Sequence, residues 1–170
     1  MKKVARPLLW TLFVFYCLVL ITVLFISRPE RPSLSYADYF REYTNFIPFK
    51  TTESFLRGMW ADIGRVLHGQ ETVGRGWIYY SINLAGNFVL FLPMGMMLPC
   101  LFARLNRFWK VTLTVLAMVV LVELTQGLLR VGSIDVDDLI FNLSGGMLGY
   151  GIIRLVGVSG VLRKTGITRL

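Results

Sequence analysis

Charged residues, cysteine and histidine are all scarce in this 170-residue sequence, and each shortage excludes a class of protein. Only 16% of the residues are charged and 55% are hydrophobic, whereas soluble domains carry roughly 25% charged residues. A chain of this length cannot bury so many apolar side chains in a water-soluble core, so lipid must solvate part of it. Cys17 and Cys100 are too few for the disulfide framework of a small secreted domain. His68 has no second histidine or cysteine nearby, so the sequence predicts no metal site and no cofactor.

The net charge of +8 is the one feature that could indicate a nucleic-acid partner. The distribution of the basic residues argues against it, because they flank apolar runs and do not form a patch on a soluble fold. Basic residues concentrated beside apolar runs are typical of membrane proteins. We therefore expect membrane lipid as the surrounding medium and no nucleic acid as a partner.

Four apolar runs are long enough to cross a bilayer, which takes about 20 helical residues. They cover residues 8–26, 78–102, 111–129 and 139–158. The first run exceeds the roughly 7–15 residues of a signal-peptide core and lacks a small-residue cleavage site after it, so we expect an uncleaved span. Pro29 and Pro32 end it. The sequence predicts an all-α integral membrane bundle of about four transmembrane helices.

The charges between these runs predict an orientation. One side of the membrane receives ten basic residues and no acidic one: Lys2, Lys3, Arg6, Arg104, Arg107, Lys110, Arg154, Arg163, Lys164 and Arg169. The other side receives the segment 28–80, with seven basic and six acidic residues, and the acidic loop at 135–138. Cytoplasmic loops carry the excess of lysine and arginine, so both termini are expected in the cytoplasm of a bacterial cell, in agreement with an even number of spans.

The external segment is expected to contain a helix over residues 52–68. Phe55, Met59, Ile63 and Val66 recur there at helical spacing. Such a helix either lies in the membrane interface with its apolar side down or packs against the spans. The aromatic residues at 77, 79 and 80 mark the interface where the second run begins.

Polar residues inside the apolar runs are the main indication of a functional site, since an unpartnered polar group is costly in hydrocarbon. They repeat at helical spacing in three of the runs, and one arginine follows the third run. The candidate residues are Asn83, Asn87, Glu123, Gln126, Arg130, Asp135, Asp138 and Asn142. A helix that starts near 135 would align the last three, and Arg130 would lie at the rim. We expect one polar site opening outward, although an N-cap at Ser133 or Asp135 and interhelical hydrogen bonds are the structural alternatives.

Gly145 and Gly149 have the spacing of a small-residue face, which lets two membrane helices approach closely. We expect them to serve helix packing.

These motifs taken together resemble the VanZ-like family. The resemblance rests on four segments in a fixed order: Asn45-Phe-Ile-Pro-Phe49, Asn83-Leu-Ala-Gly-Asn87 with Pro93 and Gly95, Glu123-Leu-Thr-Gln126, and the stretch from Asp135-Val-Asp-Asp138 through Asn142 to Tyr150. It covers about residues 45–151. It implies a multi-pass bacterial membrane protein, from a family whose founding member is associated with resistance to the glycopeptide antibiotic teicoplanin. Many members lie outside resistance clusters, so resistance is not assumed here.

The apolar runs, the charge pattern and the resemblance together predict four parts of the chain. Residues 1–27 form the cytoplasmic N-terminus and first span, residues 28–77 the external linker with its amphipathic segment, residues 78–158 the VanZ-like three-helix core, and residues 159–170 a basic cytoplasmic tail.

Two functions remain open from the sequence. In the first, the protein binds or shields a lipid-linked cell-wall precursor or a lipoglycopeptide at the outer face of the membrane. In the second, it is an enzyme that uses Glu123, Asp135 or Asp138 as a general acid or base on a lipid-phosphate or peptidoglycan precursor. The sequence has no nucleophile elbow, phosphatase signature or metal motif. A transporter is disfavoured because the four spans contain no inverted repeat.

Overall fold

The computed structural model describes residues 2–30, 33–69 and 75–158. These residues form six α-helices, two other helical turns and two short strands. In chain order the elements are α1 (Lys2–Ile21), the π-helical turn η1 (Thr22–Ile26), α2 (Tyr36–Glu42), β1 (Thr44–Asn45), α3 (Lys50–Leu67), α4 (Arg75–Leu101), the 3-10 turn η2 (Ala103–Leu105), α5 (Phe108–Leu129), β2 (Ile134–Asp135) and α6 (Val136–Val158).

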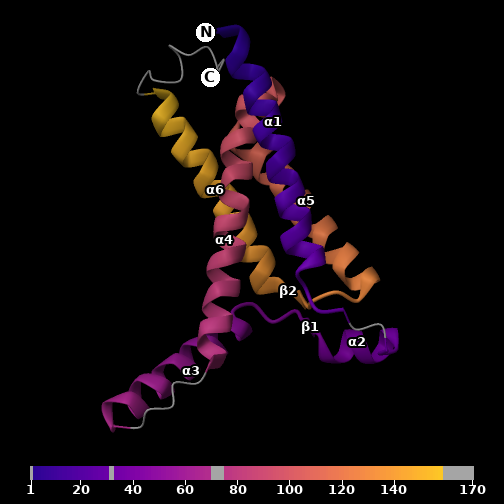
Figure 1. The fold of residues 1–170 in the computed structure, drawn as a ribbon, viewed down its shortest axis with the longest axis vertical. Coiled ribbons are helices and arrows are strands. Elements are labelled where there is room, and N and C mark those ends of the chain that lie inside the picture. Colours follow the sequence, from indigo (N-terminus) through magenta and orange to yellow (C-terminus); the bar gives the residue numbers. More distant parts are fainter. Residues whose placement is uncertain (1, 31–32, 70–74, 159–170) are drawn as a thin grey trace.

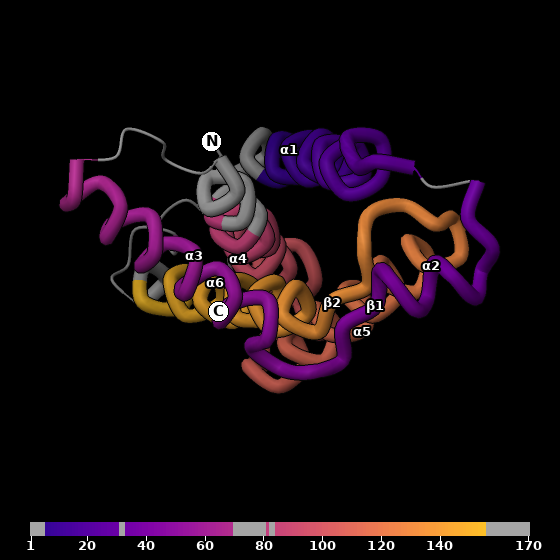
Figure 2. The backbone as a smooth tube through the Cα atoms, turned by 90° about the horizontal axis from the view of Figure 1, so that it is seen from below, coloured from indigo at the N-terminus to yellow at the C-terminus, as the bar shows by residue number. Residues whose placement is uncertain are grey.

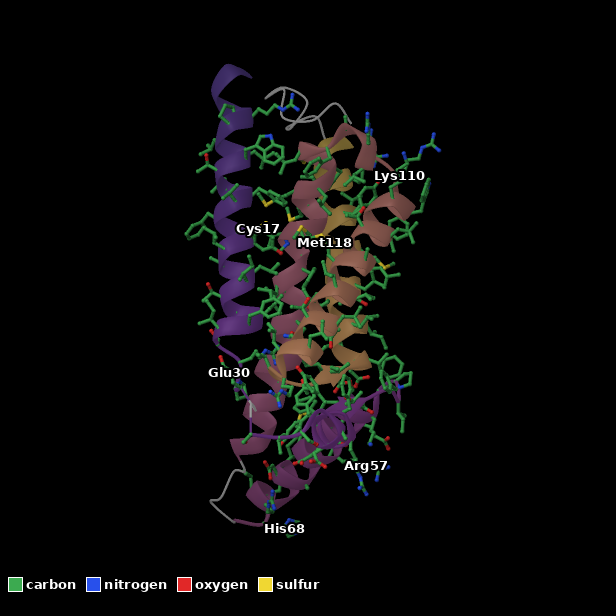
Figure 3. All side chains as sticks on the ribbon, turned by 90° about the vertical axis from the view of Figure 1, so that its right-hand side faces the viewer. Cys17, Glu30, Arg57, His68, Lys110 and Met118 are labelled. Carbon is green, nitrogen blue, oxygen red and sulfur yellow. The ribbon has the colours of Figure 1, made fainter. Side chains whose placement is uncertain are left out.

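The long axis of the molecule is followed by α1, α4, α5 and α6 (Figure 1). α1 and α5 run from one end to the other, while α4 and α6 run in the opposite direction. We call the end where α1 begins, η2 lies and α6 finishes the basic end, because Arg6, Arg104, Arg107, Lys110 and Arg154 belong to it. We call the opposite end, where β1 and β2 meet, the strand end. Figure 3 shows Lys110 near one end and Glu30, Arg57 and His68 near the other, with Cys17 and Met118 between them.

Three helical segments of the described chain are long and apolar enough to cross a membrane: Arg6–Ile26, Leu84–Leu101 and Phe108–Leu129. They correspond to the first three expected spans. The fourth expected span corresponds to α6, which has 23 residues but also carries Asp137, Asp138, Asn142 and Arg154. Within the described residues, three helices are candidate spans by length and composition, and α6 is not one of them.

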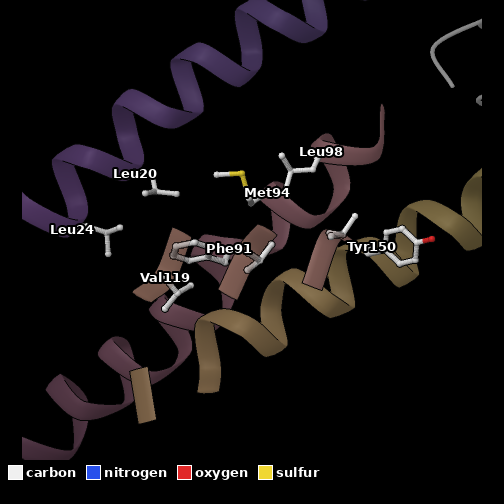
Figure 4. Packing of buried hydrophobic residues seen from close by; sticks show 9 residues of the cluster. Leu20, Leu24, Phe91, Met94, Leu98, Val119 and Tyr150 are labelled. Atoms are coloured by element: carbon white, nitrogen blue, oxygen red, sulfur yellow. The ribbon is translucent and has the colours of Figure 1, made fainter. Parts of the chain in front are cut away.

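The apolar core lies where α1, α4, α5 and α6 meet. Leu20 of α1 and Leu24 of η1 face Phe91 and Met94 of α4, and Val119 of α5 lies close by (Figure 4). α1 is also fixed by a polar contact, because the Tyr16 hydroxyl donates to the carbonyl oxygen of Leu90 at 2.6 Å. The first span is therefore part of the packed bundle, although most of its surface is exposed.

Glycines bring α4 and α6 into backbone contact. A Cβ atom on Gly145 would lie 1.9 Å from the carbonyl oxygen of Phe88, and one on Gly149 would lie 2.0 Å from that of Leu92. α4 contributes Gly95, where a Cβ would lie 1.9 Å from the carbonyl oxygen of Gly146. Only residues without a side chain fit here, so these glycines hold α6 against α4 along its length.

The strand end is built from segments far apart in the sequence. β1 and β2 pair in parallel, with Thr44 opposite Ile134 and Asn45 opposite Asp135. An isolated antiparallel bridge joins Glu30 to Val131. Seen from below, α2 and α3 leave this junction toward opposite edges of the molecule (Figure 2). The expectation of an all-α fold is therefore incomplete, because it omits α2 as a separate helix and this small sheet.

Helix α3 extends away from the bundle (Figure 1) and begins two residues earlier than the sequence predicted. Phe55 and Met59 are half-buried and Asp62 is buried. Leu56, Trp60, Ile63 and Leu67 form a second apolar stripe that remains exposed. One side of α3 therefore packs against the protein, and a neighbouring apolar side is left uncovered.

Candidate functional site

A polar pocket of about 460 Å³ lies at the strand end. Its walls come from the residues after η1, the end of α2, β1, the start of α3, the loop before β2 and the start of α6. The lining residues are Arg28, Pro29, Arg41, Glu42, Tyr43, Thr44, Asn45, Lys50, Thr51, Ser54, Gly132, Ser133, Ile134, Asp135 and Asp138. Backbone hydrogen bonds hold these segments together: Gly132 N donates to Pro29 O at 3.0 Å, and Ile134 N donates to Tyr43 O at 2.8 Å.

The turn between α5 and β2 requires unusual backbone angles. Arg130 ends α5 with a φ of 53°, and Gly132 follows with a φ of 69°. Left-handed angles of this kind end a helix and reverse the chain, and glycine adopts them without steric penalty. The turn directs the chain from α5 into β2 and α6, which brings the acidic residues beside Glu123.

Asp135 and Asp137 are buried carboxylates that are satisfied by hydrogen bonds. Asp135 accepts from Asn45 Nδ2 at 3.1 Å, from the Thr51 hydroxyl and from the backbone N–H of Asp137 at 2.9 Å. The last of these bonds makes Asp135 an N-cap of α6. Asp137, which is completely buried, accepts from the backbone N–H groups of Phe49 and Thr52 and from the Thr52 hydroxyl. It satisfies the free amides at the start of α3, so its role is structural.

Asp138 and Glu123 differ from these two carboxylates. Both are 7% exposed. The only hydrogen bond that the described residues give Glu123 is a long one of 3.4 Å from the backbone N–H of Asp135. The two carboxylates lie close enough to repel each other, and the guanidinium of Arg28 lies close enough to attract both. Two weakly partnered acids beside one arginine form the inner part of the site.

Two buried amides adjoin this inner part. Asn87 of α4, 3% exposed, accepts a hydrogen bond from Arg28 at 3.4 Å. Its Nδ2 atom faces the Asp138 carboxylate, yet no described residue gives it a partner with ordinary hydrogen-bond geometry. Among the described residues, Asn142 Oδ1 and Thr44 Oγ1 are also buried without a partner. Unpaired polar atoms in a buried position are unfavourable, so their concentration here indicates a site that a ligand or water completes.

The structure brings together most of the residues predicted from the sequence, but several of them have other partners or belong to other elements than expected. Asp135 and Asp138 line the pocket, with Glu123, Asn87 and Asn142 buried close by. Asp135 belongs to β2 and not to the expected helical face. The remaining predicted residues have other partners or are not described. Gln126 donates to the carbonyl oxygen of Leu24 at 2.8 Å and so fixes α5 to η1, the turn that follows α1. The side chain of Asn83 lies outside the described residues.

Arg130 is not at the rim of the pocket. Its guanidinium donates to the carbonyl oxygen of Leu34 and stacks on the ring of Tyr36, 4.7 Å from the ring centroid. The expected arginine of the site is replaced by Arg28, which no sequence pattern indicated. An arginine directly after an apolar run is indistinguishable in sequence from an interfacial anchor. Asp137, Thr51 and Thr52 were also missed, because their role depends on contacts between distant segments.

Three apolar spans, a bundle held by glycine contacts and a polar pocket at one end define a multi-pass helical membrane protein. The chain matches the VanZ/LLP1 family model over residues 13–157 and belongs to that family. The resemblance seen in the sequence is thereby confirmed and extends to the first span. Comparisons with curated proteins and with solved structures found no match.

Proposed function

We propose that this protein binds the polar part of a membrane-anchored amphiphile in the strand-end pocket. The occupant is a lipid-linked cell-envelope molecule or a lipoglycopeptide, and binding or shielding it alters glycopeptide susceptibility. One observation supports the proposal. At its inner end the pocket meets two weakly partnered buried carboxylates, Glu123 and Asp138, and buried amide atoms that have no partner among the described residues. Pockets that enclose small ligands measure about 300–1,000 Å³, so 460 Å³ has room for a headgroup and not for a whole glycopeptide.

We propose further that α6 is the fourth span and that the pocket opens at the outer surface. α6 has 23 residues and extends about 34 Å at 1.5 Å per residue, enough to cross the hydrocarbon. Its charged residues support this assignment, since Asp137 and Asp138 lie at the strand end and Arg154 at the basic end. A concentration of basic residues marks the cytoplasmic side, so the basic end is cytoplasmic, both termini are on that side and the pocket is external.

The exposed stripe of α3 fits this orientation. Leu56, Trp60, Ile63 and Leu67 lie on a helix that leaves the bundle at the strand end. A helix with such a stripe at the membrane surface buries it in the interface between headgroups and acyl chains. α3 would then extend along the outer leaflet, and its first turn lines the pocket that receives the headgroup.

A membrane enzyme is the second candidate. Two acids in different surroundings can act as general acid and general base, and Glu123 and Asp138 are close together, buried and beside Arg28. The substrate would be a lipid-phosphate or peptidoglycan precursor that reaches the acids through the pocket.

Mass spectrometry of lipids that co-purify with the protein in detergent tests both candidates. We expect wild-type protein to retain one class of envelope lipid above its abundance in the membrane. Glu123→Gln and Asp138→Asn keep side-chain size and one acceptor oxygen but remove the negative charge, so both variants should insert at wild-type levels and retain less of that lipid. An unchanged bound lipid supports the binding protein, and a chemically altered one supports the enzyme. Full retention in both variants would contradict the assignment of the site.

A further inference from the structure

Three basic side chains from three separate segments line the strand-end pocket. Arg28 follows η1, Arg41 lies in the last turn of α2, and Lys50 begins α3. Arg28 is half-buried, and the other two are exposed. Within the described chain the ion pairs are those of Arg57 and of Arg65, both inside α3. Among the described residues, Arg41 and Lys50 therefore have no ion-pair partner, and Arg28 is attracted by Glu123 and Asp138 without forming an ion pair.

Two of the three lining acids are buried and have partners of their own. Asp135 is occupied by donors from Asn45, Thr51 and the backbone, and Asp138 lies deeper, beside Arg28. Glu42 is then the one lining acid left beside Arg41 and Lys50. The pocket as a whole is lined by three basic and three acidic residues, but its exposed part, the mouth, has Arg41 and Lys50 against Glu42 alone and so carries one net positive charge.

We propose that the mouth of this pocket binds a phosphate group of the amphiphile's headgroup, with Arg41 and Lys50 as the outer contacts and Arg28 as the inner one. The inference rests on the proposed function and narrows its ligand to a phosphate-bearing class. A guanidinium group can donate two parallel hydrogen bonds to the oxygens of one phosphate, and lysine adds an ammonium donor on a flexible side chain. Thr44 contributes a buried hydroxyl without a partner, which supplies a neutral donor to the same space.

A general attraction between basic residues and anionic lipids is the competing explanation. Any lysine or arginine near a membrane surface experiences that attraction, whether or not it lines a pocket. The two explanations differ in which residues matter. Recognition in the pocket depends on Arg41 and Lys50, whereas general attraction depends equally on Arg57, an exposed arginine of α3 that does not line the pocket.

The test uses the purified full chain in an uncharged detergent and two short-chain probes. Dihexanoyl phosphatidic acid carries a phosphate, and dihexanoylglycerol has the same chains without it. We expect at least about tenfold tighter binding of the phosphate probe. Arg41→Gln and Lys50→Gln should each weaken it about tenfold, since each removes a charge-assisted hydrogen bond. Arg57→Gln is the matched control and should leave the affinity unchanged.

Inorganic phosphate as a competitor identifies the source of the recognised group. Displacement of the phosphate probe would mean that phosphate alone is recognised, and its failure would mean that the phosphate must be part of a lipid. Equal affinity for both probes, or an equal loss in the Arg57→Gln variant, would overturn the inference. If both probes bind equally and Asp138→Asn weakens both, the proposed function stands without the phosphate. If neither probe binds and no lipid co-purifies, both proposals fail. Unfolding temperatures measured alongside show whether each variant is folded.

Discussion

Asp137 and Asp138 are adjacent at the start of α6 but differ in their hydrogen-bond partners. Asp137 is completely buried and receives three hydrogen bonds from the start of α3. Asp138 lines the pocket, where the guanidinium of Arg28 attracts its carboxylate and the amide of Asn87 faces it. Burial of a carboxylate is favourable only where donors replace the lost water, so Asp137 holds the fold together. Asp138 has fewer and weaker partners, so its oxygens are less completely satisfied than those of Asp137.

A matched pair of substitutions separates these two roles. Asp137→Asn replaces a carboxylate oxygen with an NH₂ group that faces donors at Phe49 or Thr52, and it should destabilise the protein by about 1–3 kcal/mol. Asp138→Asn should leave stability close to wild type. Thermal unfolding of both variants in the same detergent measures the difference. Equal loss of stability in the two variants would show that Asp138 is also structural.

At the scale of elements, α4 and α6 form the tightest contact of the bundle. The space at Gly149 is filled by the backbone of α4, whereas a Cβ on Gly151, two residues further along α6, would meet no atom within 4 Å. The helices are held by backbone contact at the first position and are open at the second. The two glycines therefore offer a test and its control on one helix.

Gly149→Leu should lower the yield of folded protein and its unfolding temperature, because α6 would have to move away from α4. Overpacking of this kind costs about 1–3 kcal/mol or more. Gly151→Leu should behave as wild type. Folded yield after size-exclusion chromatography in detergent provides the measurement. A normal yield for Gly149→Leu would mean that this face of α6 does not contact α4.

Long elements were predictable from the sequence and short ones were not. An apolar run of about 20 residues identifies its own helix, so the first three spans were found with ends close to those observed. β1 and β2 have two residues each, too few to show the alternation by which strands are found. Their pairing depends on segments 90 residues apart, which no local pattern indicates.

The acidic residues of the candidate site could be predicted from the sequence, but its arginine could not. Asp135 and Asp138 lie next to an apolar run, and burying an ionisable side chain there is costly unless it has a partner or a function. The choice of Arg130 followed its distance along the chain from the acids. In the structure Arg130 has left-handed backbone angles that end α5, and its side chain contacts Tyr36. The arginine that faces the acids comes from the end of the first span, and only the three-dimensional arrangement identifies it.

At the scale of the whole molecule, the proposal requires a fixed orientation in the membrane. Reporter fusions after residues 50 and 135 should be external, and a fusion after residue 107 should be cytoplasmic, because positions 50 and 135 lie at the strand end and position 107 at the basic end. A cytoplasmic signal at residue 50 would reverse the pocket and refute the four-span arrangement.

The same arrangement places two kinds of surface near the strand end of the bundle. Ser133 lines the pocket, whereas Leu124, next to Glu123 on α5, is 60% exposed on the outside of the bundle. A photo-reactive amino acid at position 124 should therefore label the bulk lipids that surround the protein. The same group at position 133 should label only the molecule that enters the pocket.

Cross-linking at these two positions, followed by intact-mass analysis, tests the central claim most directly. If the pocket binds the headgroup of an envelope amphiphile, the adducts at position 133 belong to one lipid class and lose intensity in Asp138→Asn, while those at position 124 follow the composition of the membrane and do not change. No adduct at position 133, or the same mixture of lipids at both positions, would contradict the account.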